Sequence, residues 1–321
     1  MQYTSIPYVA KPVSRLVLGA AGARFANGGD VSDLMETALD CGINAVDTAR
    51  VYGESEAAIG RWLQKSGRRD EIVLISKGCH PNLAFLPRVN EQAAADDLER
   101  SLELLGTDHI DVYLLHRDQE SVPVGRIVDF LNRFHEEGKI GAFGGSNWTA
   151  RRVAEANEYA EKHGLTGFTV SSPHYSLGRQ KHDPWGNGCR TVTGTKNADQ
   201  RQYYHETGIP VLAWSSLCNG VFSGKLKSDS WAQLQKLFGI NARWAYGCPD
   251  NRERLAHCER LVREKDTGVA QLVLAWLLGD EMNVLPIISA SSPARIRDTA
   301  AAANLTLTPE ERAYLNLQRE L

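Results

Sequence analysis

Residues 43–56 read INAVDTARVYGESE, and this stretch decides the fold. Its first four residues form an apolar run of strand length, polar Asp47 and Tyr52 follow, and a helix-like pattern comes next. Later apolar runs end in the same way, at Lys77, at His116 and at Ser146 with Asn147. Polar residues at the carboxyl ends of successive parallel strands meet at one rim of a barrel. The sequence therefore predicts one cluster of these side chains.

The whole chain alternates strand-like and helix-like segments. Strands are expected at 16–18, 45–47, 73–77, 110–116, 142–146, 168–172, 210–215 and 284–288, and helices at 31–41, 90–105, 124–137, 149–163, 269–278 and 293–303. Eight right-handed strand–helix units close a sheet into a barrel. We therefore predict an α/β fold, a (β/α)8 TIM barrel, as one domain over residues 1–321. Segments 178–199 and 217–250 are long for barrel connections, which indicates elaborated loops on the C-terminal rim.

Composition narrows the class of protein. The 321 residues are 42% hydrophobic and 23% charged, with a net charge of −3 and no block of basic residues. That balance argues against nucleic acid or an anionic membrane as a main partner. No apolar run approaches the length of a membrane span, and the first residues do not resemble a signal peptide. We expect a cytoplasmic protein.

Six cysteines are present, and none forms a Cys-x-x-Cys pair. In a long chain without a secretion signal, free thiols are expected. Cys79, His80 and His174 invite a metal interpretation, but the spacing typical of metal ligands is missing, so no metal site is predicted. Trp62, Trp148 and Trp276 are expected in the core.

The residue types at the predicted rim suit proton transfer to a carbonyl oxygen. A phenol is a poor acid near neutral pH, and a nearby ammonium lowers its pKa by favouring the phenolate. Tyr52 would be the acid, Lys77 the group that tunes it, and Asp47 the anchor of Lys77. His116 would donate a hydrogen bond that orients the carbonyl. In the plainer interpretation, Asp47 pairs with Arg50 and Tyr52 is only a rim aromatic.

The string DTARVYGESE, followed in order by Lys77, His116 and Ser146-Asn147, resembles the signature of the aldo-keto reductases. The resemblance runs from Gly19 to about residue 300. It implies a nicotinamide dinucleotide in an extended site, with NADP(H) favoured and NAD(H) possible. No Gly-x-Gly-x-x-Gly follows a strand, so a Rossmann site is not indicated.

The resemblance also assigns cofactor residues. Ser146 and Asn147 would hold the carboxamide, Trp214 would stack on the ring, and Ser289, Ser291, Arg295 and Asp298 would hold the adenosine end. The remaining candidates are Gly19, Ser172 and the loop residues Ser215, Leu217, Asn219 and Lys225 around the pyrophosphate. Arg295 would read a 2′-phosphate, which its planar fork matches. The alternative for Arg295 is a solvated helix face.

The chain departs from the family pattern in three places. Ser172 stands where a Gln is usual, Thr299 where an Asn is usual, and Ser291 and Ser292 where a basic residue often precedes Pro293. The last departure weakens the expected preference for NADPH.

The expected partner is a small-molecule carbonyl, and a sugar-like carbonyl is favoured. Trp185 and Trp231, with Arg24, Asp183, Asn187 and Arg190, are candidate pocket walls. Two rivals remain. One is a nucleotide-sensing subunit similar to the potassium-channel β subunits, which resemble this family. The other is a barrel lyase or aldolase that uses Lys77 as a Schiff-base amine.

Overall fold

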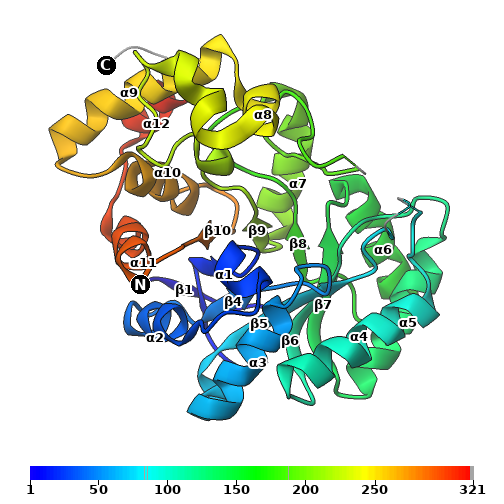
Figure 1. The fold of residues 1–321 in the computed structure, drawn as a ribbon. Coiled ribbons are helices and arrows are strands. Elements are labelled where there is room, and N and C mark those ends of the chain that lie inside the picture. Colours follow the sequence, from blue (N-terminus) through cyan, green and yellow to red (C-terminus); the bar gives the residue numbers. More distant parts are fainter. Residues whose placement is uncertain (83, 85, 187, 319–321) are drawn as a thin grey trace.

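Eight parallel strands close into a barrel, in a computed structural model that describes residues 1–318 except 83, 85 and 187. The strands are β3 (Val17–Gly19), β4 (Ala45–Asp47), β5 (Val73–Gly78), β6 (Ile110–Leu115), β7 (Ile140–Ser146), β8 (Val170–Ser172), β9 (Val211–Ala213) and β10 (Val284–Ser289). They pair in chain order, and β10 closes the barrel against β3 (Figure 1). The predicted (β/α)8 fold is confirmed. All eight predicted strands exist, although those near residues 168 and 210 are shorter than expected.

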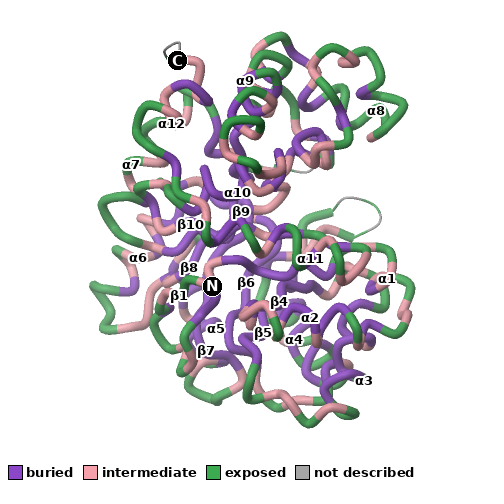
Figure 2. The backbone as a smooth tube through the Cα atoms, turned by 90° about the vertical axis from the view of Figure 1, so that its left-hand side faces the viewer, coloured by how far each residue is buried: buried purple, intermediate pink, exposed green. Residues whose placement is uncertain are grey.

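Helices surround the barrel. They are α1 (Ala23–Ala26), α2 (Ser32–Asp40), α3 (Ser55–Ser66), α4 (Glu91–Leu105), α5 (Val124–Glu136), α6 (Ala150–His163), α7 (Ala198–Thr207), α8 (Leu234–Tyr246), α9 (Pro249–Lys265), α10 (Val269–Leu278), α11 (Pro293–Ala300) and α12 (Pro309–Leu315). Figure 2 shows the barrel strands buried and the outer helical turns exposed. Within the described part of the chain, no helix is both long and apolar enough to cross a membrane.

Local sequence explains several helix ends. Asn90 and Thr149 cap α4 and α6, because their side chains accept hydrogen bonds from the backbone N–H of Ala93 and Arg152. Gly106 ends α4 in the left-handed conformation, which glycine adopts without a Cβ clash.

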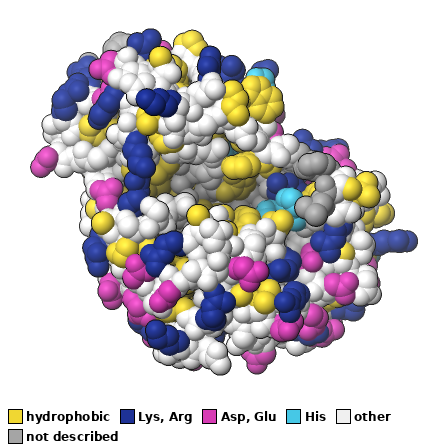
Figure 3. All heavy atoms as spheres, viewed as in Figure 1, with side chains coloured by type: hydrophobic (Ala, Val, Ile, Leu, Met, Phe, Trp, Pro, Cys, Tyr) yellow, Lys and Arg dark blue, Asp and Glu magenta, His cyan; other side chains and the backbone are white. Residues whose placement is uncertain are grey.

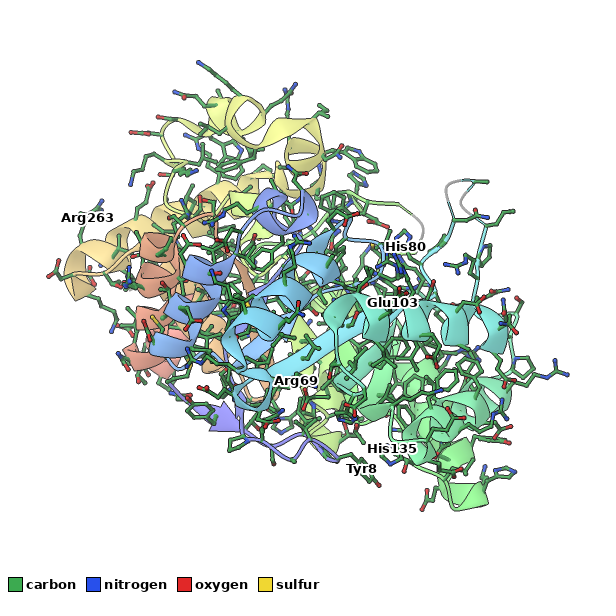
Figure 4. The ribbon with its side chains drawn as sticks, turned by 60° about the horizontal axis from the view of Figure 1, so that its bottom comes forward. Tyr8, Arg69, His80, Glu103, His135 and Arg263 are labelled. Atoms are coloured by element: carbon green, nitrogen blue, oxygen red, sulfur yellow. The ribbon has the colours of Figure 1, made fainter. Side chains whose placement is uncertain are left out.

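A short antiparallel hairpin that the sequence did not predict lies at the amino-terminal end of the barrel. It consists of β1 (Tyr3–Thr4) and β2 (Val13–Ser14). Ile6 and Val13 belong to the same buried cluster as the inward-facing Val17, Val112 and Leu285. Nearby, the Tyr8 ring contacts the His135 ring edge-on at 4.8 Å between centroids, at the end of the molecule away from His80 (Figure 4). One end of the barrel is therefore filled, which leaves the other for the site.

A glycine in β7 has no room for a side chain. A Cβ on Gly144 would lie 1.8 Å from the carbonyl oxygen of Val170 in the neighbouring strand. We expect Gly144→Ala to lower the free energy of unfolding by about 1–3 kcal/mol or more, because backbone must shift. Thermal melting checks this, with Gly268→Ala as the control, since its Cβ would meet nothing closer than 3.8 Å. Equal melting temperatures for the two variants would contradict the packing argument.

Candidate active site

The carboxyl ends of the eight strands place most of the predicted site residues at one rim. Strand register aligns Gly19 with Asp47 on one side and with Ser289 on the other. Ser146 is likewise paired with Ser172. His116 and Trp214 follow the last residues of β6 and β9. Figure 3 shows a hollow in the middle of this face, between the regions of α8 and α1 in Figure 1.

A buried ion pair joins two of these strands. The Nζ of Lys77 lies 2.5 Å from Oδ1 of Asp47 and donates a second hydrogen bond to the carbonyl of Thr48, at 2.9 Å. Both side chains are at most 5% exposed. Arg50 pairs instead with Glu56. The plainer interpretation, in which Asp47 pairs with Arg50, is therefore wrong.

Burial and charge act in opposite directions on this pair. Burial alone would lower the pKa of Lys77, but the Asp47 carboxylate and Tyr52 outweigh it, and the Lys77 pKa is raised. Burial raises the pKa of Asp47, and Lys77 opposes that rise. Lys77 is therefore a charged ammonium at neutral pH. A Schiff-base mechanism needs a neutral amine, so this geometry disfavours the lyase alternative.

The Tyr52 ring lies beside this ion pair and is partly buried. Lys77 Nζ is 5.2 Å from the ring centroid, and the ring of His116 is 5.7 Å away at its edge. Burial raises the pKa of Tyr52, while Lys77 and then Arg117 lower it. The ammonium acts in the expected direction, but the expected net fall in pKa is wrong because burial outweighs it. Tyr52 thus keeps its proton at neutral pH.

His116 is buried and neutral. Burial, followed by repulsion from Lys77 and Arg117, holds its pKa well below the ordinary value. Its Nδ1 has no hydrogen-bond partner among the described residues. A neutral imidazole has one N–H group that donates a hydrogen bond and one nitrogen that can accept one. His116 is therefore suited to orient a polar oxygen.

The residues expected near a carboxamide form a connected group. Ser146 Oγ donates to the carbonyl of Ser172 at 3.1 Å, and Asn147 Nδ2 donates to Ser146 Oγ at 3.0 Å. Asn147 has a left-handed backbone with φ of 63°. Its Oδ1 accepts from the backbone N–H of Arg190, in the loop after β8, at 3.2 Å. Ser172 Oγ donates to the carbonyl of Leu212.

Trp214 lies next to this group and packs against His174, with 4.9 Å between ring centroids. Burial lowers the pKa of His174 to about 3, so this ring is neutral. His174 bonds to Thr191 and Tyr246 and thus fixes the loop behind Trp214. The described residues contain no cluster of three or more side chains able to hold a metal.

The loop after β9 is held in an unusual backbone conformation. Ser215, Cys218 and Asn219 all have positive φ, between 51° and 53°. Ser215 Oγ donates to Oδ1 of Asn219 at 2.9 Å, Leu217 is partly buried, and Lys225 is exposed. The Oγ of Ser223 is buried, with no partner in the part of the chain that the structure describes.

The residues expected at the adenosine end lie at the end of β10 and on α11. Ser289 and Ser291 are exposed, and Arg295 is partly exposed. No ion pair of Arg295 occurs among the described side chains. Asp298 accepts a hydrogen bond from Gln271 Nε2 at 2.7 Å and so connects α11 to α10.

The long loops bring only some of the predicted pocket residues to the rim. Arg190 and Asp183 lie in the loop after β8, where Asp183 accepts from the backbone of Trp185 and Cys189. Arg24 instead pairs with Asp33. Asn187 lies outside the described residues. Trp231 lines a separate surface cavity of about 530 Å³, and none of the other predicted site residues lines it.

Two rim residues were missed as active-site candidates. Arg117 directly follows His116 and is only 8% exposed. His80 follows β5, is half-buried, and packs edge-on against His116 with 4.8 Å between ring centroids. Both stand at strand ends, so the rule that found Lys77 and His116 could have found them too.

The chain is similar to known proteins over nearly its whole length. A sequence model described as the Aldo/keto reductase family matches residues 15–317. An uncharacterized oxidoreductase, YrpG of Bacillus subtilis (strain 168), is 28% identical, covering 98% of this chain and 95% of its own length. The aldo-keto reductase YhdN of the same organism is 26% identical, over 98% and 93%. A probable voltage-gated potassium channel subunit beta of Oryza sativa subsp. japonica is 27% identical, over 97% and 94%.

Proposed function

Because the chain belongs to the aldo/keto reductase family, we propose that it is an NADPH-dependent reductase that converts a carbonyl to an alcohol. The family and its oxidoreductase-named members support a carbonyl-reducing oxidoreductase in general terms. The observation that carries the finer proposal is the buried Asp47–Lys77 pair beside the protonated Tyr52, with neutral His116 facing the same ring. We also propose that residues 1–321 act as one barrel domain.

In this proposal each side chain has one task. A reduced nicotinamide, when bound, supplies the hydride. Tyr52 gives the proton of its hydroxyl to the carbonyl oxygen, and His116 donates a hydrogen bond to the same oxygen. Lys77, held charged by Asp47, stabilises the phenolate that remains on Tyr52. The alcohol then carries one new C–H bond from the hydride and one new O–H bond from Tyr52. Solvent returns a proton to Tyr52.

The rim residues fit a nicotinamide dinucleotide. Ser146 and Asn147 would bind the carboxamide, with Ser172 beside them on β8 and Gly19 across the barrel on β3. The ring of Trp214 would stack on the nicotinamide. The Oγ of Ser223 supports this fit, because it is buried without a partner among the described residues and belongs to the loop expected around the pyrophosphate. Ser215, Leu217, Asn219 and Lys225 complete that loop.

We expect Arg295→Ala to weaken NADPH binding by about ten- to hundredfold and to leave NADH binding nearly unchanged. Arg295 has no competing ion pair among the described residues, and a charge-assisted hydrogen bond contributes roughly 1.5–3 kcal/mol. Fluorescence titration with both nucleotides measures the effect, and high salt should narrow the NADPH–NADH gap. Arg297→Ala is the matched control, since Arg297 is an exposed neighbour on the same helix. Equal weakening of both nucleotides would remove Arg295 as the reader of the 2′-phosphate.

Carbonyl reduction should hold its rate as the pH rises through the neutral range. Reduction consumes the proton of Tyr52, and because its pKa is raised, the acid form persists beyond the ordinary phenol value of about 10. The lowered pKa of His116 and the raised pKa of Lys77 also exclude a change of charge near pH 7. A profile of kcat/KM against pH tests this. A fall with a midpoint between about pH 6 and 8 would mean that Tyr52 is acidified after all.

A second candidate function has its own support. The similarity to probable potassium channel β subunits favours a nucleotide-sensing subunit with the same fold and little turnover. Titration with NADPH and NADH, followed by a panel of aldehydes, ketones and sugars, separates the two functions. A reductase turns over at least one of these carbonyls repeatedly, whereas a sensor binds the nucleotide and reduces them very slowly.

A further inference from the structure

One buried cation at the rim has no counter-ion among the described residues. Arg117 follows His116 at the end of β6 and is 8% exposed. Its Nη1 donates to the carbonyl of His116 at 2.8 Å, and its Nε has no partner among the described residues. Burying a charged group away from water is costly unless an opposite charge or several hydrogen bonds compensate it.

The acidic side chains of this region are already paired. Asp118 pairs with Arg152 at 3.2 Å, Glu120 with Arg190 at 3.1 Å, and Asp97 with Arg88 at 3.1 Å. No described carboxylate lies within ion-pair distance of Arg117. The part of the chain that the structure describes therefore provides no anion for this guanidinium, although the residue next to it in the chain is an aspartate.

Arg117 lies close enough to the proposed catalytic residues Tyr52 and His116 to act on them electrostatically. Its charge lowers the pKa of Tyr52, of His116 and of His80, each of which faces the rim. It also contacts the thiol of Cys189 in the loop after β8, which closes this side of the site. Basic and histidine side chains flank the hollow in Figure 3. An anion bound to Arg117 would thus lie close to the reacting carbonyl.

We propose that Arg117 binds an oxyanion group, a carboxylate or a phosphate, on the carbonyl substrate. This inference rests on the proposed reductase function and gives it a substrate class: small aldehydes or ketones that carry a negative charge. The planar guanidinium matches both kinds of oxyanion with two parallel hydrogen bonds. Because no described carboxylate pairs with Arg117, its guanidinium is available to an anionic group of the substrate.

The test compares charged carbonyl compounds with neutral analogues that carry the same aldehyde group. One pair is 4-oxobutanoate and its methyl ester, and the other is glyceraldehyde 3-phosphate and glyceraldehyde. With NADPH, the wild-type protein should have a kcat/KM about ten- to hundredfold higher for the charged member of at least one pair. The pair that shows the preference identifies the anion. Rising ionic strength should reduce the preference.

Arg117→Gln should bring the charged-to-neutral ratio close to one, and Arg117→Lys should keep part of the preference because the charge remains without the fork. Arg179→Gln is the matched control. It removes the same charge from a guanidinium that is already paired with Asp250 and 47% exposed, so the ratio should change less than about twofold. If Arg117→Gln does not fold, Arg117→Lys and the salt dependence of the wild type still decide the matter.

A second readout does not depend on turnover. Succinate and inorganic phosphate, which carry no aldehyde or ketone, should bind the NADP⁺-loaded wild type and bind Arg117→Gln much more weakly in calorimetric titration.

Two results together would overturn the inference and leave the reductase proposal intact: neutral aldehydes reduced as fast as charged ones, and no anion binding. No turnover of any carbonyl would refute the reductase proposal, and anion binding would then judge Arg117 alone. If Arg117→Gln weakens NADPH binding and lowers kcat/KM equally for the charged and the neutral substrate, Arg117 binds the cofactor instead, and the inference is overturned.

Discussion

Tyr52→Phe should lower the kcat for carbonyl reduction by at least about two orders of magnitude while NADPH affinity stays nearly unchanged. The reason is that positioned proton transfer contributes about 10²–10⁴-fold, and the substitution removes only the hydroxyl that carries the proton. The ring remains to fill its place beside Lys77 and His116. Steady-state oxidation of NADPH measures the loss, and nucleotide fluorescence measures the binding.

Tyr159→Phe provides the control for this substitution. It makes the same chemical change on α6, where the hydroxyl bonds to Asp129 rather than to any rim residue. Its kcat should match that of the wild type. Turnover by Tyr52→Phe within a few-fold of the wild type would remove Tyr52 as the acid, whatever the behaviour of the control.

Lys77→Met should cost about as much activity as Tyr52→Phe, and the double variant should cost little more than either one. Lys77 lies 5.2 Å from the Tyr52 ring centroid and opposes the rise of the Tyr52 pKa. Residues that act as one unit lose the same function when either is removed, so their effects do not add. If the fold-loss of activity in the double variant equals the product of the two single fold-losses, Lys77 and Tyr52 act independently.

A stability control is needed for Lys77→Met, because it leaves the Asp47 carboxylate buried without its partner. Breaking a buried pair on one side costs about 3–5 kcal/mol. The variant that combines Asp47→Asn with Lys77→Met removes both charges and should recover much of the melting temperature. If activity does not return with stability, the loss is chemical, as we expect. Recovered activity would assign the pair a purely structural role.

Local rules were sufficient to predict the barrel and the position of most site residues. Caps such as Asn90 and Thr149 act on their own helix, and Asp47 and Lys77 are placed by their strands. The rule that site residues lie at the carboxyl ends of parallel strands needs only the alternation of strands and helices and the direction of each strand.

Features that depend on the packed molecule could not be predicted in this way. The hairpin at residues 3–14 is stabilised by side chains of the distant barrel interior, such as Leu285. The kink at Gly239 in α8 reflects a backbone with φ of 84° in an otherwise regular helical pattern. The net pKa of Tyr52 depends on burial as well as on Lys77, and the sequence shows only which charge is near. The position of Arg117 at a strand end could be predicted, but its burial and the pairing of the acidic residues around it depend on the packed molecule.

The most direct test of the reductase proposal counts turnovers per molecule of protein. The wild type, saturated with NADPH and mixed in turn with charged and neutral aldehydes, ketones and sugars, is followed by the absorbance of the reduced nucleotide. The account predicts continued oxidation of NADPH with at least one carbonyl, at about 1 s⁻¹ or faster, and loss of that oxidation in Tyr52→Phe. Tight NADPH binding with no more than one equivalent oxidised for every carbonyl would contradict it and would favour a nucleotide-sensing subunit.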